Sequence, residues 1–313
     1  MMGKTTYSFT TTLLMRVGKT EEIQRCYDEN ILSFGCAANW LDYSLKQNNQ
    51  ITGDPFEGAF AHILINDLHT DTIKDVKGNP MGDHLHILKL PDNTCLLRYI
   101  PTILVPVLCF YTFNVGKIRK IMDQKGSATS WIGFDLNRYC DTMKYDKKKC
   151  SYLFITRPIC LFNELREAIP AAINKNHMNL NSDRFYGKFD PKSPYMAKDV
   201  DYCKHTRSEL FFDQSNYLDA LFWKSPEYKK QSELRIAIPN INFAQTYDYR
   251  TYDYKQNILN VKLPNLKKYT IICPADSANT LYFGNFNDSD QSLTFAIYKA
   301  SLDKFNPSEF MDI

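Results

Sequence analysis

The fold class follows from the stretch His84-Leu85-His86-Ile87-Leu88-Lys89-Leu90 and the residues after it. Polar and apolar side chains alternate along this stretch, which is typical of a half-buried β-strand. Asp92-Asn93 is a turn signal, and Thr94–Tyr99 supplies a second run of strand-forming residues. Residues 84–99 therefore predict a β-hairpin, and a hairpin favours antiparallel pairing in the sheet to which it belongs.

The rest of the chain adds strands and a few helices to this hairpin. One helix is expected to be capped by Thr20 and to end near Asn30, and Phe162–Ile169 is expected to form another that Pro170 ends. The apolar, β-branched and aromatic runs that predict strands are Tyr7–Leu14, Ile31–Phe34, Phe60–Ile65, Val105–Phe113, Tyr152–Thr156, Leu234–Ile238, Ile258–Val261, Tyr269–Cys273 and Leu293–Tyr298. Strands and helices do not alternate regularly after residue 60. We therefore expect an α+β fold with a twisted, mainly antiparallel sheet and flanking helices.

The length of 313 residues allows one large domain or two smaller ones. No low-complexity segment or linker divides the chain, so the sequence favours a single domain over residues 1–313. Residues 174–206 are polar, contain two prolines and several asparagines, and predict a long loop.

Charge and cysteine usage limit the cellular setting. The net charge of +3 does not indicate nucleic acid as a partner. The longest apolar run, Ile100–Phe113, contains two prolines and is shorter than the roughly 20 residues of a membrane span, and no leader segment is recognised. The nine cysteines form no Cys-x-x-Cys pair and lie mostly in apolar runs. A cytoplasmic protein with nine reduced, metal-free cysteines is expected.

Several catalytic motifs are absent from the sequence. It has no phosphate loop, no Rossmann glycine pattern, no Gly-x-Ser-x-Gly and no His-Glu-x-x-His. His84 and His86 share a strand face, but no carboxylate or third histidine has a spacing typical of a metal site, so no metal is expected. A nuclease is disfavoured because it needs clustered acidic ligands.

The first segment that can carry chemistry is Asp54-Pro55-Phe56-Glu57-Gly58. Pro55 biases the residue before it toward an extended conformation, and Gly58 allows a bend directly after Glu57. Both acidic residues therefore stand in contexts that shape the backbone. We interpret Asp54 and Glu57 as organisers of a turn rather than as catalytic groups.

The second segment is Trp223–Ile238, in which a polar stretch leads into an apolar strand. Glu233 and Arg235 are two residues apart, so on a strand they point to the same face, opposite to the side chains that form the core. This pair is either a structural ion pair or a site in which Glu233 acts as catalytic carboxylate and Arg235 binds an anion.

These segments resemble a family of uncharacterised bacterial and phage proteins with a domain of unknown function. The resemblance covers most of residues 5–240 and rests on Glu22–Glu57, Leu108–Phe113 and the Gln-Ser-Glu-x-Arg pattern within Tyr228–Arg235. Family members often lie near phage-defence or abortive-infection genes. The resemblance therefore implies a role in phage–host conflict, as a defence or counter-defence protein.

The opening of the chain also looks like that of ADP-ribosyltransferases. That likeness implies NAD as cofactor and Glu233 as the carboxylate that stabilises an oxocarbenium-like ribose. It further implies that Thr10, Thr11 and Tyr43 line the cofactor. Aromatic walls for nicotinamide would come from Trp40 or Tyr111, and a cation for the pyrophosphate from Arg98 or Arg235.

Two functions from different classes follow. The first is an NAD-using ADP-ribosyl or glycosyl transferase that acts in phage–host conflict. The second is a non-enzymatic module that binds a nucleotide signal or a partner protein, for which the 20 Tyr and 20 Phe residues suit an interaction surface. The surroundings of Glu233 discriminate between them, because a closed aromatic pocket favours the enzyme and an exposed ion pair with Arg235 favours the module.

Overall fold

Strands dominate the computed structural model, and their pairing is mainly antiparallel. The prediction of an α+β fold is thereby confirmed. The structure describes residues 11–40, 54, 56–68, 74, 82–114, 132–142, 145–175, 189–202, 214–239, 241, 243, 258–284 and 294–298. The chain divides into two compact units, of which the first comprises Met1–Ile31, Phe110–Glu164 and Pro264–Ile313 and the second Leu32–Cys109 and Leu165–Leu263. The single domain that the sequence favours stays a prediction.

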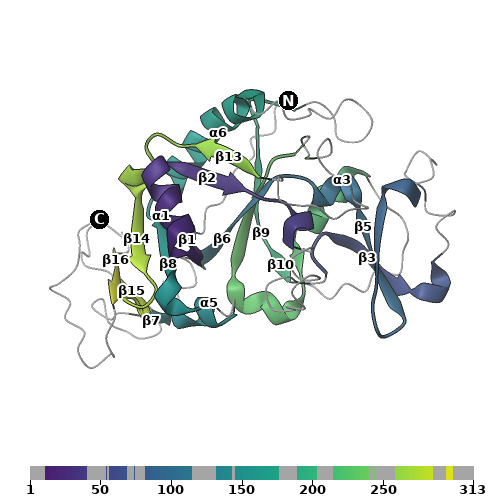
Figure 1. Ribbon diagram of the computed structural model, residues 1–313, viewed down its shortest axis with the longest axis horizontal. Coiled ribbons are helices and arrows are strands. Elements are labelled where there is room, and N and C mark those ends of the chain that lie inside the picture. Colours follow the sequence, from purple (N-terminus) through teal and green to yellow (C-terminus); the bar gives the residue numbers. More distant parts are fainter. Residues whose placement is uncertain are drawn as a thin grey trace. The chain divides into compact units, whose positions relative to one another are not determined.

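An antiparallel sheet with the strand order β14-β8-β1-β6 forms the first unit. Its strands are β1 (Thr11–Lys19), β6 (Val107–Asn114), β8 (Cys150–Ile155) and β14 (Thr270–Pro274). Helix α1 (Thr20–Glu29) lies beside β1, β8 and β14 (Figure 1).

The ends of α1 follow local rules with one correction. Asn30 ends the helix in the left-handed conformation with φ 56°, as its position predicts. Thr20, however, is the first helical residue rather than the cap. The cap is Lys19, and the Thr20 hydroxyl instead forms a 3.0 Å hydrogen bond with the Ser151 hydroxyl on β8. A tertiary contact has thus replaced the local cap.

A smaller sheet completes the first unit. It has the order β16-β15-β7, with β7 (Ile132–Asp135), β15 (Thr280–Gly284) and β16 (Thr294–Tyr298). Helix α5 (Asn137–Thr142) follows β7. Aromatic and aliphatic side chains from both sheets and from α5 form the buried core of this unit, which includes Leu13, Phe113, Tyr139, Tyr152, Phe154 and Phe283.

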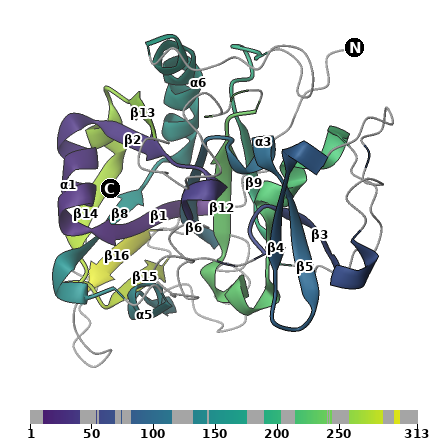
Figure 2. The same ribbon diagram turned by 45° about the vertical axis from the view of Figure 1, so that its right-hand side comes forward.

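The second unit contains the hairpin that the sequence predicts. Strands β3 (Ala59–Leu64), β5 (Thr94–Tyr99) and β4 (Leu85–Lys89) form an antiparallel sheet with β5 in the centre (Figure 2). Asn93 adopts φ 62° in the turn between β4 and β5, so the predicted hairpin and its turn are both confirmed.

The second unit contains further strand pairings. Strand β12 (Glu233–Ala237) pairs antiparallel with β9 (Met196–Asp199), and β10 (Asp201–Tyr202) pairs parallel with β11 (Trp223–Lys224). The remaining two-stranded sheet consists of β2 (Ile31–Phe34) and β13 (Leu259–Lys262). Further helical segments within the described residues include η1 (Ile65–Asp67), η3 (Gly82–His84), α3 (Ile100–Ile103), η4 (Lys147–Lys149), α6 (Pro158–Lys175), η5 (Gln214–Phe222), η6 (Pro226–Gln231) and η7 (Leu266–Tyr269).

Two sequence predictions are corrected. Helix α6 does not end at Pro170 but continues to Lys175, because Ala172 and Ile173 are buried and their packing outweighs the local cost of an internal proline. The predicted loop over 174–206 begins inside this helix and contains β9 and β10, which pair with distant strands.

The cysteines and the helices bear on the expectation of reduced thiols and no membrane span. Eight of the nine cysteines are free thiols, and Cys203 lies outside the described residues. Among the described residues, no helix combines the length and apolar character needed to cross a membrane.

Candidate functional site

Asp54 and Glu57 belong to a tight turn that leads into β3. The Asp54 carboxylate accepts a 2.8 Å hydrogen bond from the Phe56 amide, and the Asp54 carbonyl accepts one of 2.9 Å from the Glu57 amide. Gly58 ends the turn with φ +67°, where a Cβ atom would lie 2.9 Å from a methyl group of Ile103. The predicted turn is therefore confirmed, and the Glu57 side chain projects from it.

A second local reversal brings Lys224 and Glu233 together. The 3-10 helix η6 starts after Ser225, with Pro226 in its first turn, and ends at Ser232 in the left-handed conformation with φ 46°. The chain therefore returns on itself, and the Lys224 Nζ donates to Glu233 Oε2 at 2.8 Å and to Gln231 Oε1 at 2.7 Å.

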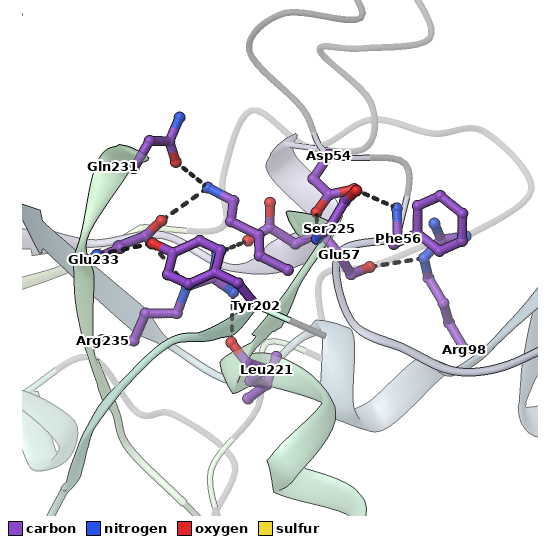
Figure 3. Close-up of polar contacts among 11 residues, drawn as sticks. Asp54, Phe56, Glu57, Arg98, Tyr202, Leu221, Ser225, Gln231, Glu233 and Arg235 are labelled. Atoms are coloured by element: carbon purple, nitrogen blue, oxygen red, sulfur yellow. Dashed lines mark hydrogen bonds and ion pairs between the residues drawn. The ribbon is translucent and has the colours of Figure 1, made fainter. Parts of the chain in front are cut away.

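Arg235 joins the two acidic side chains. Its Nε donates to Glu233 Oε1 at 2.7 Å, its Nη2 forms an ion pair with Glu57 Oε1, and its Nη1 donates to the Leu221 carbonyl (Figure 3). Glu57 comes from the early turn and the others from the second segment. We call Glu57, Lys224, Glu233 and Arg235 the ionic cluster.

The ionic cluster is almost entirely removed from water. Side-chain exposure is 1% for Arg235, 4% for Glu57, 7% for Glu233 and 11% for Lys224. Removing charges from water costs several kcal/mol per ion unless close partners compensate, so two acids and two bases in contact are the arrangement that permits burial. The Glu233–Arg235 ion pair is therefore buried, whereas the non-enzymatic module would be favoured by an exposed one.

The two glutamates of the ionic cluster differ in acidity. Burial raises the pKa of the Glu57 carboxyl above its usual range, and Arg235 and Lys224 offset only part of that rise. Burial also opposes ionisation of Glu233, but the positive charges of Arg235 and Lys224 outweigh it and hold the pKa of that carboxyl well below its usual range. One acid of the pair therefore binds a proton more tightly than a free glutamate and the other binds it less tightly.

The two bases of the ionic cluster stay charged. Burial disfavours the charged form of Lys224 and Arg235, yet the pKa of each is raised by Glu233 and Glu57. All three nitrogens of the Arg235 guanidinium face acceptors of the protein. Arg235 is thus placed to hold the two carboxyl groups, whereas the catalytic interpretation of the sequence has it bind an anion.

Aromatic side chains border the ionic cluster. The Arg235 guanidinium lies 5.4 Å from the centre of the Trp40 ring, and Lys224 Nζ lies 5.3 Å from that of Tyr228. The Tyr202 hydroxyl accepts a 2.9 Å hydrogen bond from the Glu233 amide. Aromatic rings therefore contact both bases of the ionic cluster, and a tyrosine hydroxyl contacts the backbone of Glu233.

Two further residues tie the Glu57 turn to its surroundings. Asp54 Oδ2 accepts a 2.6 Å hydrogen bond from the amide of Ser225, which lies 171 residues away in the sequence and directly follows Lys224. Arg98, on β5, donates from Nε to the Glu57 carbonyl at 2.9 Å (Figure 3). Both contacts fix the backbone from which the Glu57 carboxyl projects.

The structure brings together part of the predicted site. Glu233, Arg235 and Trp40 meet in the ionic cluster and at its border, and Arg98 contacts the turn that bears Glu57. The others are placed elsewhere. The ring centres of Tyr111 and Tyr139 lie 4.6 Å apart in the first unit, and Thr11 is the first residue of β1. Thr10 and Tyr43 lie outside the described residues.

Sequence reasoning missed Lys224 and the carboxyl of Glu57. Lys224 stands just before Ser225-Pro226, a turn signal that could have indicated a chain reversal toward Glu233. Glu57 was assigned to the turn alone, and no local pattern reveals that its side chain meets Arg235. In the described part of the chain, no group of three or more His, Cys, Asp or Glu side chains is placed to hold a metal ion.

Comparisons with known proteins add no relative. No protein-family model, no curated protein and no solved structure matches this chain. The resemblance to the family of uncharacterised bacterial and phage proteins stays a prediction, and the function is argued from the site.

Proposed function

We propose that this protein is an NAD-using ADP-ribosyl or glycosyl transferase whose reaction centre is the ionic cluster. The observation that carries the proposal is that Glu57 and Glu233 share one arginine while their pKa values are displaced in opposite directions. Paired carboxyl groups with separated pKa values are characteristic of sites in which one group handles a proton and the other stays ionised.

Each glutamate has a distinct role in this proposal. NAD supplies an ADP-ribosyl group whose bond to nicotinamide breaks, with the electron pair leaving on the nicotinamide nitrogen. Ionised Glu233 stabilises the positive charge that develops on the ribose. Glu57 accepts the proton of the acceptor hydroxyl as its oxygen bonds to the ribose carbon, and a raised pKa makes it a stronger base than an ordinary glutamate.

The surrounding residues fit these roles unequally. Trp40 offers an aromatic face beside Arg235 and suits the nicotinamide ring. Arg235 holds both carboxyl groups and is a positioning residue, since its nitrogens already face protein acceptors. We therefore assign it no pyrophosphate contact.

The decisive experiment incubates cell extract with the protein and labelled NAD and follows released nicotinamide and labelled products by mass spectrometry. Glu233→Gln keeps the size of the side chain and removes its charge. We expect it to lower kcat on the order of a hundredfold or more. Glu227→Gln, an exposed glutamate six positions earlier, is the matched control and should retain activity. Equal activity of Glu233→Gln and wild type would exclude Glu233 as the catalytic carboxylate.

A second candidate function, the non-enzymatic module that binds a nucleotide signal or a partner protein, is supported by one observation. Both oxygens of Glu233 already pair with Arg235 and Lys224. A carboxylate satisfied in this way is also what a structural ionic core requires. A melting temperature that rises with added nucleotides, in the absence of any NAD turnover, would favour the module over the transferase.

The biological setting of the proposal is phage–host conflict in the cytoplasm. It is supported by the family resemblance and by the cysteine usage of the sequence. Bacteria that express the wild-type protein or Glu233→Gln should differ in plaque number after phage challenge, and cell fractionation should recover the protein in the cytoplasmic fraction. Equal plaque numbers with both proteins would show that the Glu233 carboxylate has no role in phage–host conflict.

A further inference from the structure

Arg98 is one of the two arginines that the likeness to ADP-ribosyltransferases implies for a pyrophosphate, and the structure buries it completely. Its exposure is 0%, so its guanidinium does not reach solvent. Its Nε donates to the Glu57 carbonyl at 2.9 Å, and a hydrogen bond from a charged donor is among the stronger ones in proteins. The contact is made to the residue whose side chain enters the ionic cluster.

His86 fixes the other end of the Arg98 guanidinium. The two residues face each other across the β4–β5 pair, and Arg98 Nη1 lies 3.5 Å from His86 Nδ1. Burial, together with the charge of Arg98, lowers the pKa of His86 to about 4. The imidazole is therefore neutral near pH 7, and a neutral ring with its proton on Nε2 accepts from Arg98 through Nδ1.

We propose that Arg98 is a positioning residue, which acts through the Glu57 carbonyl to hold the Glu57 carboxyl against Arg235. The central strand β5 provides the rigid base, and His86 orients the guanidinium. The Asp54 carboxylate, which accepts from the Ser225 amide, holds the same turn from the side of Lys224. The catalytic meaning of this assignment rests on the proposed function, whereas the positioning itself does not.

The charged groups that face Glu57 determine how the pKa of its carboxyl responds when the turn moves. They are Arg235 and Glu233 from β12, Lys224 from β11, and Asp54 from the same turn. If Arg98 no longer holds the turn, the Glu57 carboxyl gains access to water. Its ionised form is then better solvated, so its titration midpoint should fall toward the ordinary glutamate value of about 4.3.

The test is a carboxyl ¹³C NMR titration of the full chain labelled at glutamate, in which Glu57→Gln identifies the Glu57 signal. Arg98→Lys keeps the charge but removes the Nε donor, and we expect the Glu57 midpoint to fall toward the ordinary glutamate value. Leu96→Ala on the same strand is the control, because Leu96 is also fully buried. It should lower stability and leave the midpoint in place.

An unchanged Glu57 midpoint in folded Arg98→Lys would overturn the proposal. If Arg98→Lys does not fold, His86→Ala decides the question. Loss of the ring should move the midpoint in the same direction by a smaller amount, and an unchanged midpoint would overturn the proposal in the same way.

An activity measurement separates this proposal from the proposed function. If the transferase assignment is correct, the acidic limb of the pH profile of kcat should move with the Glu57 midpoint in Arg98→Lys, while KM for NAD stays the same. A raised KM with an unmoved midpoint would instead assign Arg98 to pyrophosphate binding. If no variant and no wild type turns over NAD, the transferase assignment fails, and the titration alone still decides the role of Arg98.

Discussion

The ionic cluster of the second unit and the aromatic core of the first unit are both buried, but they are built from opposite kinds of side chain. In the aromatic core, the rings of Phe113, Phe134 and Phe283 lie 5.6–5.9 Å apart in edge-on and tilted contacts. In the ionic cluster, four charged side chains, one of them Arg235, fill the interior. The aromatic core gains free energy from leaving water, whereas each ion of the cluster loses its hydration.

This contrast indicates which part of the molecule has a functional role. Apolar side chains of the same volume would fill the ionic cluster at similar or better stability, so stability alone does not explain charges in this place. The aromatic core needs no explanation beyond packing. The following predictions test this contrast.

The largest effect is expected for Arg235→Met, which keeps much of the side-chain volume and removes the charge. Glu57 and Glu233 would both lose the partner that they share. A buried charge without its partner costs about 3–5 kcal/mol, and urea unfolding should show a loss of this size.

A double variant provides the control for this prediction. Adding Glu57→Gln to Arg235→Met removes the carboxylate that has lost its ion-pair partner, while Glu233 keeps its 2.8 Å ion pair with Lys224. The double variant should therefore recover part of the lost stability without recovering activity. A loss below about 1 kcal/mol for Arg235→Met alone would contradict the contrast, because the cluster would then behave like exposed ion pairs.

A smaller effect is expected in the aromatic core for Tyr152→Phe. The Tyr152 hydroxyl donates to the buried Leu136 carbonyl at 3.0 Å, so the variant leaves that oxygen without this donor. The expected loss of stability is about 1–2 kcal/mol, and NAD turnover should be unchanged. A loss of turnover at wild-type stability would show that the first unit contributes to the chemistry.

The fold was predictable from the sequence where the signals are local. The strand within 84–90, the turn at Asn93 and the left-handed position of Asn30 all have causes within a few residues, and the structure contains each of them, with the strand at Leu85–Lys89. The end of a helix at Pro170 and the loop over 174–206 were wrong because distant packing decides there. Ala172 and Ile173 are buried, and β9 pairs with β12.

Only the part of the candidate site that lies on β12 was predictable from the sequence. The two-residue spacing places Glu233 and Arg235 on one face of β12, and their ion pair agrees with that geometry. The partner Glu57 was not predictable, because the contact between its turn and the second segment spans most of the chain. The same applies to Arg98, whose burial follows from its place on the central strand β5.

The two glutamates should have opposite effects on stability as pH changes. The pKa of Glu57 is raised by folding, so its contribution is full below the unfolded pKa of about 4.3 and is lost as pH rises through the folded pKa. The pKa of Glu233 is lowered, so its contribution is present above about 4.3 and is lost as pH falls. Each pH unit between the folded and unfolded pKa values changes the free energy of unfolding by about 1.4 kcal/mol.

Difference curves isolate these contributions from other titrating groups. The free energy of unfolding, measured from pH 3 to 8, should decline less with rising pH in Glu57→Gln than in the wild type. It should decline less with falling pH in Glu233→Gln. Parallel curves for wild type and both variants would show that neither pKa is displaced by folding.

The smallest effect is expected at Lys198–Asp219, an ion pair with the same 2.8 Å separation as Lys224–Glu233. Its side chains are 47% and 35% exposed, so water and salt already screen both charges. Asp219→Asn should therefore change the free energy of unfolding by less than about 1 kcal/mol, and that change should vanish at high salt. Glu233→Gln, measured alongside, should cost more and depend less on salt. If the two variants cost the same at every salt concentration, burial does not set the strength of these pairs, and the contrast between the ionic cluster and an ordinary surface fails.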